Sequence, residues 1–353
     1  MTDAATTPPI FDGHNDLVLR LLRGDVTPEG VAAGLPDGHI DLPRAQAGGL
    51  GGGFFAVFVP SPPVPGTSPD DMNQPQYDLP LPLMLPEAEG RDVTIKGIAA
   101  LEALERAGAV TLCRTVDALE EALFGPTMAA IMHIEGAEGI DPGLEQLHAL
   151  HARGLRSLGP VWSRPTIFGH GVPFAFPSGP DTGPGLTDHG KRLIRECNAL
   201  KIMVDLSHLN EKGVDDVAAI SDAPLVATHS NAWAVTPHSR NLTDRQLAMI
   251  AESDGMVGIN FASAFLRSDG QMKGDVPLEQ MMRHLDHLIG ILGEDRVGFG
   301  SDFDGALVPN EITDCAGLPA LRTAMRAHGV DEALMEKLCW RNWMRVLRKT
   351  WGA

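Results

Sequence analysis

Residues Pro9–Asp16 read PIFDGHND, a short apolar run that closes on a histidine and an acidic side chain. Runs of this kind, rich in Val, Ile and Phe and ending in polar or glycine residues, return seven more times along the chain. They are Gly52–Val59, Ala129–Gly136, Gly154–Trp162, Ile202–His208, Leu225–Ser230, Met256–Phe261 and Val297–Asp304. Near-continuous apolar runs are typical of parallel strands that are buried on both faces.

Patterns with helical periodicity separate most of these runs. They are Val93–Ala107, Leu144–Arg153, Asp188–Ala199, Glu211–Ala219, Thr243–Glu252 and Leu278–Leu292. Alternation of strand and helix predicts the α/β class, and eight units in about 300 residues indicate a (β/α)8 TIM barrel. An open doubly wound sheet is the main alternative, but no G-x-G-x-x-G follows the first strand. We expect one domain over residues 1–353, closed by a helix at Asp331–Trp351 that packs against the barrel.

Two segments interrupt the alternation. Pro60–Pro86 is dense in proline, and Thr166–Gly185 is rich in glycine and proline. Each follows the C-terminal end of a predicted strand, which is the face where barrel enzymes build their sites. We interpret both as long loops that cover a site, although decoration of the surface is the alternative for each.

The chain of 353 residues has a formal net charge of −18, which disfavours binding to nucleic acid or to anionic membranes. It has no apolar stretch of 18 residues, and its first residues lack the basic and apolar regions of a secretory signal. We therefore expect a soluble cytoplasmic protein. The four cysteines are far apart and are predicted to be free, buried thiols.

Six side chains with acidic or imidazole groups fall at or just after the ends of predicted strands. They are His14, Asp16, Glu135, His208, His229 and Asp302. A lone histidine is usually structural, but six such groups in matching positions of a barrel would converge on one mouth. Imidazole and carboxylate together suit one or two divalent cations, with zinc favoured over calcium. A water between two such ions would become a hydroxide near neutral pH and attack a carbonyl, and a remaining carboxylate would carry its proton.

These residues resemble the membrane (renal) dipeptidase family, the M19 metallopeptidases of the amidohydrolase superfamily. The resemblance covers nearly the whole chain and lies in six segments that follow the order and spacing of the family. They are FDGHNDL at Phe11–Leu17, IEGAEGID at Ile134–Asp141, and then VDLSHLN, ATHSNAWAV, SRNLTD and GFGSDFDG.

The resemblance implies a dipeptidase with two zinc ions (Zn2+) per subunit. His14 and Asp16 would bind one ion and His208 and His229 the other, with Glu135 as the bridge between them. Asp302 would act as the catalytic acid and base beside a bridging hydroxide. Arg240 would hold the C-terminal carboxylate of the substrate, a role that suits a bidentate guanidinium, with a salt bridge at the barrel rim as the alternative.

The resemblance also implies a homodimer and tolerance of a D-residue at the C-terminal position of the dipeptide. The chain departs from the family at the end of the fourth strand, where Trp162 stands in place of a histidine that contacts the scissile carbonyl. We consider His170, on the following loop, as its replacement. The segment after Glu135 reads Gly136-Ala137-Glu138 instead of the familiar G-G-H. These changes bear on substrate specificity more than on metal binding.

Two other functions compete with the dipeptidase. The first is a related amidohydrolase reaction on N-acyl amino acids or lactones, which only a comparison of substrates separates from it. The second is a binding protein without catalysis. Retention of all six site residues argues against the second, because a binding protein has no need of Asp302 as a proton carrier.

Overall fold

The computed structural model describes residues 7–352, and its centre is a barrel of eight parallel strands. The strands are β1 Ile10–Asn15, β2 Leu50–Phe58, β5 Met128–Glu135, β6 Leu155–Gly159, β8 Met203–Val204, β9 Val226–Ala227, β10 Met256–Asn260 and β11 Val297–Gly300. They pair in the order β8-β6-β5-β2-β1-β11-β10-β9, and a parallel bridge between Asp205 and Val226 joins the two end strands. All eight predicted strands are present, and the TIM-barrel prediction is confirmed.

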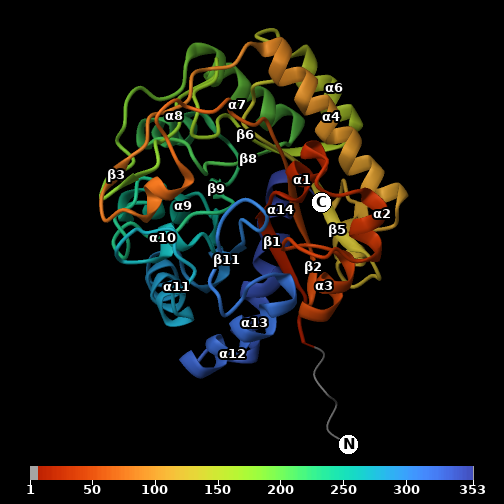
Figure 1. Ribbon diagram of the computed structural model, residues 1–353. Coiled ribbons are helices and arrows are strands. Elements are labelled where there is room, and N and C mark those ends of the chain that lie inside the picture. Colours follow the sequence, from red (N-terminus) through yellow and green to blue (C-terminus); the bar gives the residue numbers. More distant parts are fainter. Residues whose placement is uncertain (1–6, 353) are drawn as a thin grey trace, which may run out of the picture.

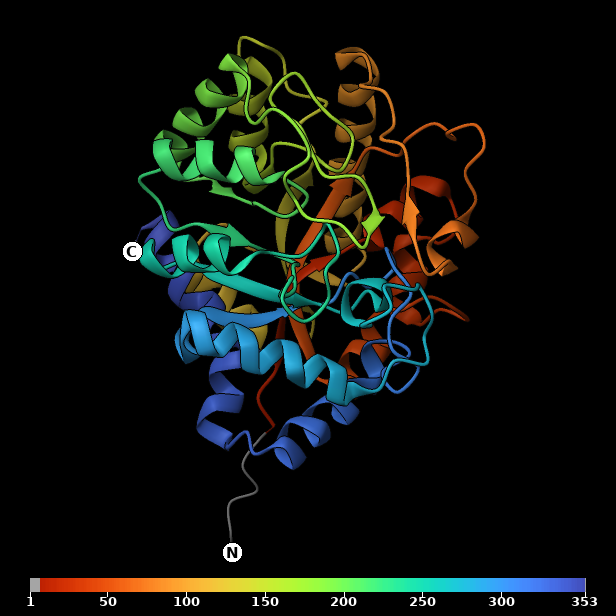
Figure 2. The same ribbon diagram turned by 90° about the vertical axis from the view of Figure 1, so that its left-hand side faces the viewer.

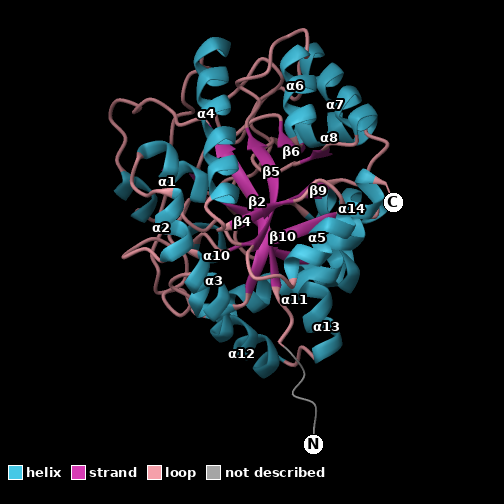
Figure 3. Ribbon diagram, turned by 90° about the vertical axis from the view of Figure 1, so that its right-hand side faces the viewer, coloured by secondary structure: helices cyan, strands magenta, loops and turns pink. Residues whose placement is uncertain are grey.

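Helices surround the barrel, as the cyan elements around the magenta strands show in Figure 3. The six predicted helices are present as α4 Glu87–Arg106, α6 Glu145–Arg153, α7 Asp188–Leu200, α8 Glu211–Ile220, α9 Asp244–Glu252 and α11 Leu278–Leu292. The helix α4 begins before the predicted Val93, because Glu87 and Glu89 in its first turn favour helix formation through the dipole. Six further helices escaped the periodicity analysis: α1 Leu17–Arg23, α2 Pro28–Ala33, α3 Leu42–Gly48, α5 Val116–Leu123, α10 Ser263–Leu266 and α12 Leu318–His328.

The C-terminal segment is helical as predicted but is not one regular helix. It consists of α13 Glu332–Glu336, a π turn at Lys337–Arg341 and α14 Asn342–Trp351. Trp343 of α14 is fully buried, with its ring 6.0 Å from that of Phe11 and 5.4 Å from that of Phe54. A side chain at Gly13 would lie 2.6 Å from the Trp343 ring, so only glycine leaves room for the indole between the strands. The segment therefore closes the N-terminal end of the barrel.

The two long loops meet above the opposite end. A two-residue strand in each, β3 Tyr77–Asp78 and β7 Ala175–Phe176, forms an antiparallel pair. Figure 2 shows the orange β3 beside the yellow-green β7, and Figure 1 shows the orange loop running across the molecule to reach it. A small apolar cluster, separate from the main core, joins these loops to the segments after β10 and β11. Its members are Ala262, Ala264, Phe265, Met72, Phe174, Met272 and Ala306.

Two other expectations concern the chain as a whole. The four cysteines are free and buried, as predicted. Among residues 7–352, no helix combines the length and the apolar character that a membrane crossing requires.

Candidate metal centre and substrate cavity

The C-terminal ends of the strands bring the five predicted metal ligands together. His14 lies in β1 with Asp16 just after it, and Glu135 is the last residue of β5. His14 Nε2 is 3.4 Å from a carboxylate oxygen of Asp16 and 3.7 Å from Glu135 Oε1. The three side chains are buried and lie close enough to hold one cation between them.

A second group shares Glu135 with the first. The Nε2 atoms of His208 and His229, which follow β8 and β9, lie 3.1 Å and 3.5 Å from Glu135 Oε1. They lie 3.1 Å from each other. One carboxylate thus stands between three imidazole rings, a position from which it could be shared by two cations.

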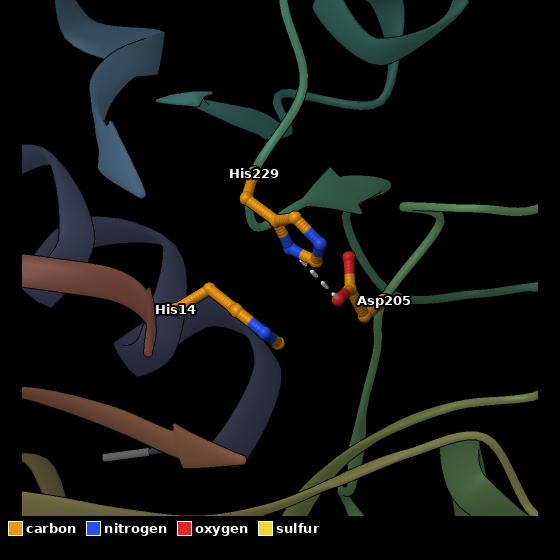
Figure 4. Close-up of side chains that lie close together, drawn as sticks. All are labelled: His14, Asp205 and His229. Carbon is orange, nitrogen blue, oxygen red and sulfur yellow. Dashed lines mark ion pairs between the residues drawn. The ribbon is translucent and has the colours of Figure 1, made fainter. Parts of the chain in front are cut away.

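Asp205, which the sequence analysis overlooked, determines how His229 is oriented. The Thr228 hydroxyl donates to Asp205 Oδ2 at 2.5 Å, so its oxygen is free to accept from His229 Nδ1 at 2.8 Å. With the proton on Nδ1, the lone pair of Nε2 faces Glu135. Figure 4 shows Asp205 and His14 on either side of the His229 ring, with a dashed line from Nδ1 to the Asp205 carboxylate, 3.9 Å away. The only signal in the sequence was the position of Asp205 three residues before His208.

The charges of the rings support the same interpretation. Burial lowers the pKa of His208 and His229 well below the ordinary value, so both rings are neutral. Ser163 Oγ lies 3.1 Å from His208 Nδ1 and can accept a hydrogen bond from it. Two neutral nitrogens whose lone pairs face each other at 3.1 Å repel unless a cation or a proton lies between them. The donor set therefore fits divalent cations of the zinc type.

His14 behaves differently from the other two rings. Burial lowers its pKa, but the negative charges of Glu135 and Asp16 outweigh burial and raise that pKa to about 10. Neither ring nitrogen has a hydrogen-bond partner within residues 7–352. The two carboxylates favour positive charge at this ring, so a cation bound between His14, Asp16 and Glu135 would replace the proton that they otherwise hold on it.

Asp302, the predicted acid and base, follows β11 at the edge of this cluster. Asn260 Nδ2 donates to its Oδ2 at 2.9 Å, and a side chain at Gly305 would overlap both Asp302 Oδ1 and Asp16 Oδ2. Desolvation in the cavity wall raises the pKa of Asp302, and the charge of Asp16 adds to the effect. Asp302 and His208 have φ angles of 59° and 69°, a left-handed conformation that is uncommon outside glycine and is concentrated at functional sites.

A cavity of about 390 Å³ opens above these residues. Polar groups form its floor, and apolar side chains form its walls. The lining includes Asp16, Glu135, His208, Asp302, Phe58, Trp162, Phe174 and Phe265. The predicted substrate-contact residue Trp162 thus lies in the wall, with its ring 5.1 Å from Phe58 and 5.8 Å from the His208 ring.

Comparison with known proteins decides what kind of site this is. A family model described as membrane dipeptidase, peptidase family M19, matches residues 2–351. The chain belongs to the membrane dipeptidase family. It is a metallopeptidase, a hydrolase that acts on the peptide bond of dipeptides.

Similar proteins include two solved structures. One is a metallo peptidase from Rhodobacter sphaeroides liganded with a phosphinate mimic of the dipeptide L-Ala-D-Ala, at 57% identity and a TM-score of 0.95. The other is the dipeptidase AC, a metallo peptidase of family M19, with the same identity and TM-score. Each alignment covers 98% of this chain and 100% of the other. An uncharacterized protein in the pqqA 5′ region of Klebsiella pneumoniae is 48% identical over 262 residues, 74% of this chain and 97% of that protein.

Arg240 of this M19 dipeptidase lies behind the cavity wall. It is 3% exposed, and its Nη2 donates to the His229 carbonyl at 3.1 Å. Its guanidinium carbon lies 5.4 Å from the centre of the Phe265 ring, which lines the cavity. Its Nε has no hydrogen-bond partner in the described part of the chain. A buried guanidinium with an unused donor is suited to an anionic group of a ligand.

His170 is not brought to the site in the way we expected. It is half-buried, its Nδ1 lies 3.1 Å from the Gly185 carbonyl oxygen, and it is not among the described residues that line the cavity. The loop folds so that this ring packs against the chain before α7 instead of facing the strand ends. The glycines on either side of His170 did not indicate in which direction its side chain would point.

A buried ion pair is the other feature that the sequence analysis did not interpret. Arg164 Nη2 lies 2.6 Å from Glu138 Oε1, and both side chains are almost completely buried. The same guanidinium donates to Ser61 Oγ at 2.5 Å and to the Val59 carbonyl at 2.8 Å. It therefore joins the segments after β2, β5 and β6 at the edge of the cavity. Glu138 stands in the segment where the dipeptidase departs from the family's G-G-H.

Proposed function

We propose that this M19 dipeptidase works with two zinc ions and accepts dipeptides with a D-residue at the C-terminal position. His14 and Asp16 would hold one ion, His208 and His229 the other, and Glu135 both. The observation that carries the proposal is the Glu135 carboxylate, whose Oε1 lies within 3.7 Å of all three imidazole Nε2 atoms. When bound, the ions lower the pKa of water and polarise a carbonyl.

Asp302 is proposed to move the proton. The Asn260 side chain donates a hydrogen bond to Oδ2 of Asp302. The other oxygen, Oδ1, lies beside Asp16 and Gly305 at the cavity. Its raised pKa suits a carboxylate that accepts a proton from the attacking water and then donates it to the leaving amine.

Arg240 and the apolar walls are proposed to position the substrate. The unused Nε of Arg240 would bind the C-terminal carboxylate through a charge-assisted hydrogen bond. Trp162, Phe58 and Phe174 would surround the side chains of the dipeptide and exclude water from the peptide bond. The mimic of L-Ala-D-Ala in the similar structure from Rhodobacter sphaeroides supports both the size of the ligand and the D-residue. The family resemblance also supports a homodimer.

Metal content together with a substrate panel tests the proposal. Protein from zinc-supplemented cells should hold close to two zinc ions per chain and hydrolyse L-Ala-D-Ala faster than N-acyl amino acids or lactones. His14→Ala should lower the content to about one ion. The exposed His148 provides the matched control, because His148→Ala should leave two ions bound. Less than one ion per chain, with no activity regained on adding zinc, would contradict the proposal.

A further inference from the structure

The chain contains a single tyrosine, Tyr77, and it reaches from the proline-rich loop to the segment that carries Arg240. Tyr77 is half-buried in β3. Its hydroxyl donates to the Gly270 carbonyl at 2.6 Å and lies 3.0 Å from His238 Nε2. Residues 161 positions apart in the sequence are thus in direct contact beside the cavity.

The direction of these hydrogen bonds is fixed. The backbone N–H of Arg240 donates to His238 Nδ1 at 3.0 Å, so this nitrogen carries no proton. The neutral ring then has its proton on Nε2, which donates to the Tyr77 oxygen. Burial, followed by the charge of Arg240, lowers the pKa of His238 well below its ordinary value and keeps the ring neutral. A single directed chain therefore runs from Arg240 through His238 and Tyr77 to Gly270.

His238 is placed where a change of its orientation would reach the substrate. It is fully buried, with its ring 4.6 Å from that of Phe265. Phe265 lines the cavity and also lies under the Arg240 guanidinium. A tilt of the His238 ring would therefore move both the backbone of Arg240 and the aromatic face against which its guanidinium rests.

The neighbouring residue links the same segment to the second loop. Ser239 Oγ accepts from the Ala175 N–H at 3.1 Å, and Ala175 belongs to β7, the partner of β3. Two consecutive residues before Arg240 are thus each bonded to one strand of the small sheet above the barrel. The backbone just before Arg240 is therefore attached to both strands of this sheet.

We propose that Tyr77 is a positioning residue for recognition of the substrate's C-terminal carboxylate, acting through His238 on Arg240. The proposal rests on the proposed role of Arg240. The proline-rich loop thereby completes the carboxylate site, and loss of the hydroxyl lets the His238 ring and the Arg240 backbone move.

Tyr77→Phe tests this with the loss of one oxygen atom. For a dipeptide with a free C-terminus, KM should rise roughly threefold to tenfold, the value of one hydrogen bond, while kcat changes less than twofold. The preference for the free over the amidated dipeptide should fall by the same factor. Asp78→Asn is the matched control, because Asp78 is the exposed neighbour in the same strand and should change neither quantity.

Repeating the substitution in the His238→Asn variant separates positioning of Arg240 from a general loosening of the loop. Asn at position 238 can still accept from the Arg240 N–H but is too short to reach Tyr77, so Tyr77→Phe added to His238→Asn should raise KM less than twofold further. An unchanged KM in Tyr77→Phe, or an equal loss on free and amidated substrates, would overturn the coupling while leaving the dipeptidase intact. A wild-type enzyme that cleaves both substrates equally well would overturn the Arg240 assignment and the coupling with it.

Discussion

Aromatic side chains fill the N-terminal end of the barrel, whereas buried polar side chains gather at its C-terminal end. At the N-terminal end the Trp343 indole fills the space between the strands against Phe11 and Phe54, and its Nε1 donates to the Phe299 carbonyl at 3.2 Å. At the C-terminal end both nitrogens of His14 and the Nε of Arg240 are buried without a hydrogen-bond partner among residues 7–352.

The difference separates stability from function. Aromatic rings and a satisfied indole stabilise the fold through burial and packing. Buried polar groups without partners are unfavourable. They also occur at the N-terminal end, at Arg322 Nε and Trp340 Nε1, but at the C-terminal end they lie together with buried carboxylates beside the cavity. Substitutions at the N-terminal end should therefore lower the stability of the fold, whereas substitutions at the C-terminal end should lower activity.

The largest effect is expected at the C-terminal end. Asp302→Asn should lower kcat by about 10²–10⁴-fold, because an amide cannot take the proton from the attacking water. The metal content and the melting temperature should stay close to those of the wild type. Steady-state kinetics, metal analysis and thermal unfolding measure the three quantities. A near-normal kcat would assign the proton transfer to another residue and weaken the contrast between the two ends.

The counterpart at the N-terminal end is Trp343→Ala. Removal of a fully buried indole should lower the free energy of unfolding by about 3–5 kcal/mol, while the folded fraction keeps its kcat. Urea unfolding followed by kinetics in the native range measures both. The partly exposed Trp233 serves as control, since Trp233→Ala should cost about 1 kcal/mol or less. A large fall in kcat for Trp343→Ala with little loss of stability would contradict the separation.

A smaller effect is expected for the carboxylate of the substrate. Amidation of the C-terminus would leave Arg240 without the anionic partner that we propose for it, and a charge-assisted contact contributes about 1.5–3 kcal/mol. The value of kcat/KM should therefore fall at least tenfold on the amidated dipeptide, and Arg240→Ala should abolish the preference. Equal rates on the two substrates, or an Arg240→Ala variant with the wild-type KM, would remove Arg240 from the site.

The smallest effect is expected at His170 and tests whether this loop residue belongs to the functional site. His170 hydrogen-bonds to the Gly185 carbonyl and lies outside the cavity lining, so His170→Asn should change kcat less than threefold. A loss of 10²-fold, the size expected for a donor to the developing oxyanion, would show that the loop rearranges to bring His170 over the carbonyl. Kinetics on the best dipeptide decide between the two results.

How far the sequence predicts this protein is clearest from its histidines. Those at strand ends, such as His208 and His229, could be placed close together because a barrel brings all strand ends to one mouth. His170 could not be assigned, because a loop flanked by glycines has no preferred direction until it packs. The same holds for Tyr77 and His238, which the sequence separates by 161 positions and which meet only through the pairing of β3 with β7.

By itself the sequence determined the order of the eight barrel strands, six of the helices between them and the side chains that stand at the strand ends. The periodicity of buried residues and the end at which a strand stops are local properties, and both can be recognised in short runs such as PIFDGHND. Only the tertiary structure decided that Thr228 and Asp205 orient His229, that Arg164 joins three loops and that Trp343 fills the opposite end of the barrel. Those contacts join residues distant in the sequence, and their geometry depends on how the finished barrel packs its loops and its last helix.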